Sequence, residues 1–240
     1  MRKPKMILFD YGQTLINEER FNGIKGIEEV LKYAAKNRYQ LSPAEVQEEA
    51  EKIKKELGRI DPMKRHLFQV EVPNHMFNAY LYESLGIELS LTSEQIDQVF
   101  WDAASPGIPT SGIESFLEYL YKNGIRTGVI SNISYAGSVV KNRINKLIPD
   151  NHFEFIIATS EYMFRKPNKR IFELALEKAG VEASEVWYIG DQYECDIVGA
   201  RNVGIFPVWY LGAIDMPYKE CDDVKKITDW EELQMLMEKI

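Results

Sequence analysis

The sequence has few cysteines, no long apolar run and no excess of positive charge. Cys195 and Cys221 are its only cysteines, too few for a disulfide framework or a cysteine-based zinc site. Unpaired thiols are typical of proteins kept in a reducing compartment. No stretch is apolar over the length of a membrane span or of a signal peptide. We therefore expect a cytoplasmic protein that has no membrane partner.

The charge balance restricts the possible ligands. The formal net charge is -8 at pH 7, which argues against nonspecific binding to nucleic acid or to anionic lipid. A small phosphorylated ligand remains compatible, because a site can be locally positive inside an acidic protein. The 240 residues, 45% of them hydrophobic, can build one large domain or two modest ones. No pattern indicates an oligomeric state.

An apolar run near the start of the chain predicts a buried strand that ends at a carboxylate. Residues 6–9 are Met-Ile-Leu-Phe, and Asp10 follows directly. Such a run suits a strand covered on both faces, as in a parallel sheet packed between helices. Open α/β sheets bind ligands at the carboxyl ends of their strands, where we expect Asp10 to lie. Gly12 lets the backbone approach a ligand or an ion closely.

The second half of the chain alternates between strand and helix patterns. Such alternation predicts an α/β fold with a doubly wound parallel sheet, which is a Rossmann-like core. An amphipathic helix over residues 229–240 is expected to pack on this sheet through Trp230, Leu233, Met237 and Ile240. The further strands are predicted at residues 126–130, 155–159, 186–189 and 205–210.

Between the first two strands lies a long segment with helical patterns and no convincing strand. Two capping boxes, at Ser42 and Thr92, mark helix starts in it. Its helices are predicted at residues 21–37, 42–58, 74–85 and 92–104.

Two connectors, residues 16–20 and 105–112, join this helical segment to the rest of the chain. The second is rich in proline and glycine, and a pair of such connectors is typical of a hinged lid. We therefore predict an α/β core of residues 1–16 and 109–240, with an inserted α-helical cap of residues 17–108.

Polar side chains follow successive predicted strands in a pattern that suits phosphoryl transfer. Asp10, Ser131 and Asp191 stand at the carboxyl ends of strands, Lys166 precedes a helix, and Asp196 follows Asp191 closely. Two carboxylates, Asp10 and Asp191, suit one Mg²⁺ ion, with a backbone carbonyl near Gly12 as a further ligand. One oxygen of Asp10 then stays free to attack phosphorus, while a hydroxyl and an ammonium hold the transferring oxyanions.

These residues resemble the haloacid dehalogenase-like (HAD) hydrolases over nearly the whole chain. Each motif is weak alone, but four of them in this order, each in a suitable strand context, are specific. The motifs are Phe9-Asp10-Tyr11-Gly12-Gln13-Thr14-Leu15, Val129-Ile130-Ser131-Asn132, Lys166-Pro167-Asn168 and Ile189-Gly190-Asp191-Gln192-Tyr193-Glu194-Cys195-Asp196. The inserted helices are similar to the α-helical cap of this family.

The resemblance implies a role for each site residue. Asp10 is expected to be the nucleophile that forms an aspartyl-phosphate, with Asp191 as a metal ligand. Asp196 is expected to orient the metal shell or Lys166. The residues expected to bind the phosphoryl group or the substrate, or to support that binding, are Thr14, Ser131, Asn132 and Lys166.

One position departs from the family. Most phosphatases of this kind carry a second Asp two residues after the nucleophile, which protonates the leaving group and later activates water; here that position is Gly12. General acid–base help is worth about 10²–10⁴ in rate. The protein must therefore take this help from the cap, with His66 and Glu71 as candidates, or turn over slowly.

The sequence therefore predicts a Mg²⁺-dependent phosphatase of small phosphorylated metabolites. One alternative is a catalytically weakened protein that binds metal or phosphate or acts as an interaction partner. A second is a phosphonatase-like C–P hydrolase, which would need a cap lysine such as Lys25 or Lys64. A 2-haloacid dehalogenase is disfavoured, since those enzymes lack the acid pair formed here by Asp191 and Asp196.

Overall fold

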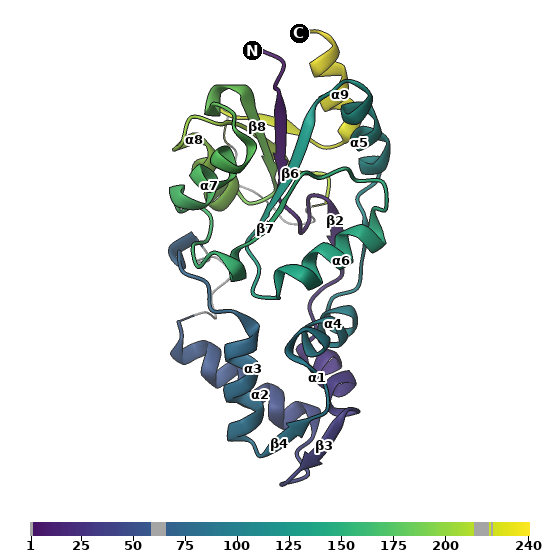
Figure 1. Cartoon of the computed structure of the whole chain (residues 1–240), viewed down its shortest axis with the longest axis vertical. Coiled ribbons are helices and arrows are strands. Elements are labelled where there is room, and N and C mark those ends of the chain that lie inside the picture. The colour runs from purple at the N-terminus through teal and green to yellow at the C-terminus, as the bar shows by residue number, and fades with distance from the viewer. Residues whose placement is uncertain (1, 59–65, 214–220, 222) are drawn as a thin grey trace.

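A parallel sheet of six strands, in the order β10-β9-β8-β1-β6-β7, forms the centre of the protein (Figure 1). The structure is a computed structural model that describes residues 2–58, 66–213, 221 and 223–240. All neighbouring pairs in this sheet are parallel, as expected for a doubly wound fold. The strands are β1 (Met6–Phe9), β6 (Arg126–Ser131), β7 (Ile156–Ala158), β8 (Val186–Gly190), β9 (Phe206–Tyr210) and β10 (Lys225–Ile227).

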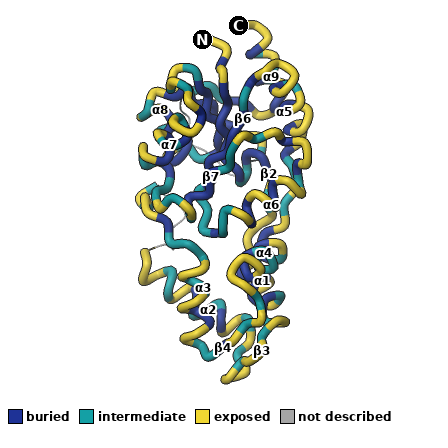
Figure 2. Tube along the Cα trace, viewed as in Figure 1, coloured by how far each residue is buried: buried dark blue, intermediate teal, exposed yellow. Residues whose placement is uncertain are grey.

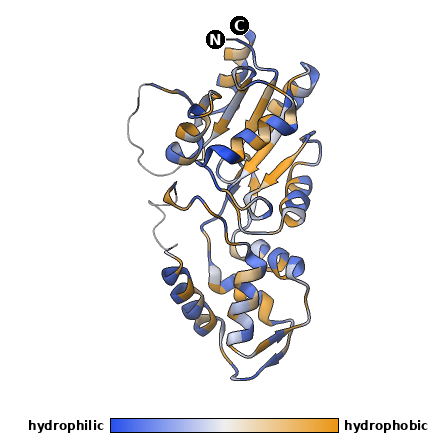
Figure 3. Cartoon of the chain, turned by 60° about the vertical axis from the view of Figure 1, so that its left-hand side comes forward, coloured by the Kyte–Doolittle hydropathy of each residue, from blue (hydrophilic) through white to orange (hydrophobic). Residues whose placement is uncertain are grey.

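Strand β1 lies between β6 and β8 and is buried over its whole length. Its side chains alternate between two hydrophobic clusters: Ile7 and Phe9 enter one, and Met6 and Leu8 enter the other. The apolar run is unbroken because both faces of the strand are covered. Buried residues accordingly concentrate in the sheet, whose strands are also mostly hydrophobic (Figures 2 and 3). The predicted buried strand is confirmed.

Helices cover both faces of the sheet. One cluster takes side chains from α5, α6 and α9, and the other takes them from α7 and α8. The helices around the sheet are α5 (Ile113–Lys122), α6 (Gly137–Leu147), α7 (Lys169–Ala179), α8 (Gly199–Arg201) and α9 (Trp230–Glu238); the short turns are η2 (Thr159–Glu161), η3 (Ala183–Glu185) and the π-helical η4 (Tyr193–Val198). None of the helices in the described part of the chain has the length and apolar character of a membrane span.

Residues 23–58 and 66–104 fold into a largely helical group that lies below the sheet in Figure 1. Its buried apolar side chains, among them Val30, Val46 and Leu81, form a cluster of their own. The predicted capping boxes at Ser42 and Thr92 are both present. Its helices are α1 (Gly23–Leu31), α2 (Pro43–Glu56), α3 (Asn74–Ser84) and α4 (Ser93–Ala104).

Two features of this segment correct the sequence-based prediction. The helix expected at residues 21–37 ends at Leu31, and β3 (Ala34–Asn37) pairs with β4 (Ile87–Leu89). Helical periodicity is a local signal and carries no information about a partner strand about 50 residues away. The pairing with that strand therefore overrides the local helical preference. The two connectors, for which no strand was predicted, also pair as the antiparallel strands β2 (Ile16–Glu18) and β5 (Gly107–Pro109).

The edges of the sheet hold two further differences. Strand β10 was not predicted, because it has only three residues, of which Ile227 alone is buried. Helix α9 packs on the sheet as expected, through the buried Trp230, Leu233 and Met237. Ile240 was wrongly assigned to this face, since it lies beyond the end of the helix and is exposed.

We expect Trp230→Ala to destabilise the protein by about 3–5 kcal/mol, because it empties a fully packed site. The Trp230 ring stacks on Tyr210 at 4.4 Å between centroids and also contacts Phe9 and Phe116. Met235→Ala, at an exposed position of the same helix, is the matched control and should change stability by less than about 0.5 kcal/mol. Urea unfolding followed by circular dichroism measures both, and similar losses in the two variants would contradict the packing.

Candidate active site

A cavity of about 420 Å³ lies at the carboxyl ends of β1 and β6. Its wall on the side of the sheet includes Asp10, Ser131 and Lys166. Glu18 and Trp101, from the inserted segment, also line the cavity. The cavity is thus bounded by residues that are far apart in the sequence.

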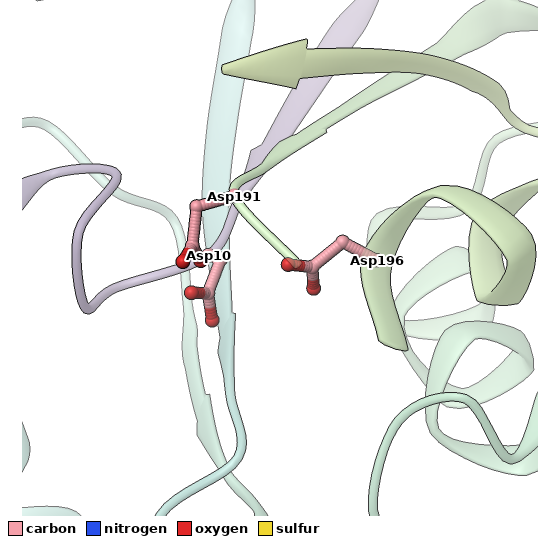
Figure 4. A group of neighbouring side chains, drawn as sticks. All are labelled: Asp10, Asp191 and Asp196. Atoms are coloured by element: carbon pink, nitrogen blue, oxygen red, sulfur yellow. The ribbon is translucent and has the colours of Figure 1, made fainter. Parts of the chain in front are cut away.

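Three aspartates meet beside this cavity (Figure 4). Asp10 follows β1, Asp191 follows β8, and Asp196 lies in η4. Each offers one carboxylate oxygen such that all three oxygens lie within 4.8 Å of one another. All three residues are buried. The structure therefore brings together the two carboxylates that we predicted to share an ion, Asp10 and Asp191.

Lys166 connects this group of aspartates. Its ammonium donates hydrogen bonds to Asp10 Oδ1 at 2.6 Å, to Asp196 Oδ1 at 2.7 Å and to the Tyr188 hydroxyl at 2.7 Å. Burial disfavours the charged lysine, but the neighbouring carboxylates of Asp10 and Asp196 outweigh this and keep its pKa above the usual value. Lys166 is therefore a fixed cation inside the protein, and Asp196 accepts one of its hydrogen bonds.

The three aspartate carboxylates carry more negative charge than the single Lys166 ammonium can neutralise. Burial and the negative charge of Asp10 raise the pKa of Asp191 well above its usual value. Among the described residues, Asp191 Oδ1 is buried without a hydrogen-bond partner, although a carboxylate oxygen normally finds one. Carboxylate oxygens with excess negative charge, one of them unpartnered, are the kind of ligands that a hard divalent cation needs.

The other predicted phosphate-binding residues occupy different positions. Ser131 ends β6 and lines the cavity. Asn132 also lines it, but its amide exchanges two hydrogen bonds of 2.8 Å with the backbone of Lys166, so the side chain holds the lysine in place. Thr14 is fully buried and is not among the described residues that line the cavity. Its place behind the wall suits support of the first loop.

Sequence analysis missed Glu18, which lines the cavity next to Gly12. Its Oε1 accepts a 2.9 Å hydrogen bond from Trp101 Nε1 and lies 3.5 Å from the guanidinium of Arg143. Burial raises the pKa of Glu18 to about 7, although Arg143 and Trp101 act to lower it. The sequence signal that could have identified Glu18 is the alternation of side chains along β2: Ile16 is buried, Asn17 is exposed, and Glu18 points inward again.

The residues suggested as replacements for the missing acid lie elsewhere. Glu71 is buried, and its Oε2 pairs with Arg165 and accepts a 2.8 Å hydrogen bond from Thr159. Neither Glu71 nor His66 belongs to the described lining of the cavity. Lys25, considered for C–P cleavage, is exposed on α1 and does not line it either, and Lys64 lies outside the described residues.

Comparison with known proteins gives consistent results. Residues 4–204 match the family of haloacid dehalogenase-like hydrolases. A glyceraldehyde 3-phosphate phosphatase of Pyrococcus furiosus is 32% identical over 134 residues, which cover 53% of this chain and 54% of that protein. A pyrimidine 5'-nucleotidase of Escherichia coli is 32% identical over 130 residues, with 53% and 56% covered. The chain thus spans about half the length of these two curated relatives.

Solved structures show that the whole fold is shared. A 2-haloacid dehalogenase of Pseudomonas syringae superposes with a TM-score of 0.68 at 21% identity, covering 100% of this chain and 99% of that one. A HAD phosphatase of Thermococcus onnurineus superposes with a TM-score of 0.62 at 21% identity, covering 99% and 98%.

We expect Lys166→Met to destabilise the protein by about 3–5 kcal/mol, because it leaves buried carboxylates without their cation. The matched control is Lys169→Met, which removes an exposed lysine that pairs with Glu173 and should cost less than about 1 kcal/mol. Adding Asp196→Asn to Lys166→Met should recover part of the loss. Urea unfolding measures all three variants; a double variant less stable than Lys166→Met would show that the carboxylates do not repel one another.

Proposed function

The chain belongs to the haloacid dehalogenase-like hydrolases, and we propose that it is a Mg²⁺-dependent phosphatase of small phosphorylated metabolites. The observation that carries the proposal is the meeting of Asp10 and Asp191 beside the ammonium of Lys166. The similarity to a glyceraldehyde 3-phosphate phosphatase and to a nucleotidase supports a phosphate ester as substrate. The cavity of about 420 Å³ suits a small one.

The residues present fit a magnesium ion. Asp10 and the unpartnered Oδ1 of Asp191 would hold it, with the carbonyl of Gly12 as a further ligand. When bound, the ion supplies positive charge to the phosphate and to the carboxylates around it. Asp196 acts on this arrangement through Lys166, to which it is hydrogen-bonded.

In our proposal, Asp10 attacks the phosphorus of the substrate. One of its oxygens, Oδ1, accepts the hydrogen bond from Lys166, which fixes the orientation of the carboxylate. The other oxygen forms the new bond to phosphorus while the bond between phosphorus and the leaving-group oxygen breaks, which yields an aspartyl-phosphate. Water then attacks the same phosphorus, and inorganic phosphate leaves while the Asp10 carboxylate is regenerated.

The remaining polar residues are proposed to hold the transferring group. The hydroxyl of Ser131 and the ammonium of Lys166 stabilise the oxyanions that carry charge in the transition state. Asn132 keeps Lys166 in position through its two backbone contacts, and Thr14 supports the loop after Asp10.

We further propose that residues 17–108 act as a cap over a core of residues 1–16 and 109–240. The short pairing of β2 with β5 lies at the two crossings between these parts and is the natural position for a hinge. The cap would then choose the substrate, because Phe21 and Trp101 come from it and face the cavity.

We expect Asp10→Asn to abolish turnover, with a loss of more than about 10⁴-fold in kcat, because an amide cannot replace the nucleophilic carboxylate. Release of inorganic phosphate from a panel of phosphate esters with Mg²⁺ measures this. Glu19→Gln, an exposed carboxylate on the same cavity, is the matched control and should keep its activity. Full activity of Asp10→Asn would refute the mechanism, and a wild type inactive on every ester would favour a binding or interaction protein.

We also expect Mg²⁺ to raise the melting temperature of the wild type, and Asp191→Asn to remove this effect. An ion present at 100 times its dissociation constant stabilises the folded state by about 2.7 kcal/mol. Without Mg²⁺, Asp191→Asn should melt no lower than the wild type, because it removes one of three crowded negative charges. Thermal melting with MgCl₂ and with EDTA tests both points, and an equal Mg²⁺ shift in both proteins would exclude Asp191 as a ligand.

A further inference from the structure

The proposed reaction requires a proton carrier that the aspartates cannot supply. An alkoxide leaving group needs a proton as its bond to phosphorus breaks, and the attacking water must later lose one. Asp10 is occupied as the nucleophile. Asp191 faces Asp10 as the second ligand of the ion, and Asp196 accepts the hydrogen bond of Lys166. The carrier must therefore be another group on the cavity wall.

Two further carboxyl groups belong to the described lining of the cavity, Glu18 and Glu19. Glu19 is exposed. The side chain of Glu18 is only 19% exposed, and strand β2 directs it inward. Glu18 is thus the one of the two that the protein holds in a defined position within the cavity.

The contacts of Glu18 orient its carboxyl group. Trp101 and Arg143 both lie against Oε1, at 2.9 Å and 3.5 Å. Oε2 lies 3.5 Å from the point at which a Cβ atom of residue 12 would stand. Because Gly12 has no side chain, this oxygen meets the loop that directly follows Asp10. A carboxyl oxygen thus lies within contact distance of the point where a side chain at position 12 would begin.

We propose that Glu18 is the general acid and base of the reaction, and this inference rests on the function proposed above. In the first step the Glu18 carboxyl group gives its proton to the leaving-group oxygen, so that an alcohol departs and Asp10 carries the phosphoryl group. In the second step the Glu18 carboxylate takes a proton from water as the water oxygen bonds to phosphorus. Inorganic phosphate leaves, and both carboxyl groups return to their starting states.

The support of Glu18 comes from both parts of the chain. Trp101 lies in α4 of the inserted segment, whereas Arg143 lies in α6 beside the sheet and also donates a 2.9 Å hydrogen bond to the Tyr11 hydroxyl. The guanidinium stacks on the Trp101 ring at 4.3 Å. The packing of the inserted segment against α6 therefore positions Glu18, which ties the proposed proton transfer to this packing.

The test compares Glu18→Gln with the wild type on p-nitrophenyl phosphate and on an alkyl phosphate that the wild type hydrolyses, both with Mg²⁺. Nitrophenolate leaves without a proton, but hydrolysis of the aspartyl-phosphate still needs a base. We expect Glu18→Gln to release one equivalent of nitrophenolate rapidly and then to turn over about 10²–10⁴-fold more slowly than the wild type. On the alkyl phosphate, Glu18→Gln should show no rapid phase, because the alkoxide leaving group needs the missing proton.

A rescue variant separates proton transfer from structure. Position 12 does not have a left-handed backbone conformation, and a Cβ there would make only an ordinary 3.5 Å contact with Glu18 Oε2, so the backbone tolerates a side chain at this position. The double variant Gly12→Asp/Glu18→Gln should turn over at least about tenfold faster in the steady state than Glu18→Gln alone. Thermal melting of each variant confirms that it is folded.

The control variant Asp102→Asn removes a different carboxyl group that contacts Arg143. Asp102 accepts a 2.7 Å hydrogen bond from the same guanidinium but does not belong to the described lining of the cavity. This variant should show no rapid phase and near-normal turnover. Equal losses of activity in Asp102→Asn and Glu18→Gln, or unchanged activity in Glu18→Gln, would overturn the assignment of Glu18. The proposed phosphatase function would still stand if the wild type is active and Asp10→Asn is inactive. A wild type inactive on every ester would instead remove the proposed function, and the inference with it.

Discussion

The arrangement of the site depends on one buried ammonium group. Lys166 comes from the segment before α7, yet it reaches Asp10 after β1, Asp196 in η4 and Tyr188 in β8. These contacts join three parts of the chain at one edge of the sheet. Burying a lysine is costly unless carboxylates compensate its charge, and burying carboxylates is costly unless a cation compensates them. Each group therefore needs the others, which holds the loops of the site in a common position.

The same charges explain why the site suits both a metal and a phosphate. One ammonium cannot neutralise three aspartates, and this excess of negative charge supports the proposed divalent cation. In the proposed function, this cation and Lys166 together would offer positive charge to a phosphoryl group inside an acidic protein. The net charge of -8 is a sum over the whole chain, whereas the charge balance at this edge of the sheet is set by four buried side chains.

Position in space matters more here than position in the sequence. A glycine two residues after the nucleophile suggested a missing catalytic group and therefore slow turnover. The chain turns back after Gln13, which adopts a left-handed conformation, and returns along β2 so that Glu18 meets Gly12. A carboxyl group six residues further along thus reaches the same region. Motif comparison alone does not detect such a shift, because it compares residues at fixed spacings.

The sequence by itself determined the buried strand before Asp10, the alternation of strands and helices that gives a parallel sheet, and the positions of Asp10, Ser131 and Asp191 at the strand ends. These features follow from local periodicity and from the rule that parallel strands end at a common edge. Only the tertiary structure decided the pairing of β3 with β4, the turning of Asn132 toward Lys166, and the approach of Glu18 to Gly12. Each of these depends on contacts between distant segments, whose energies local sequence patterns do not contain.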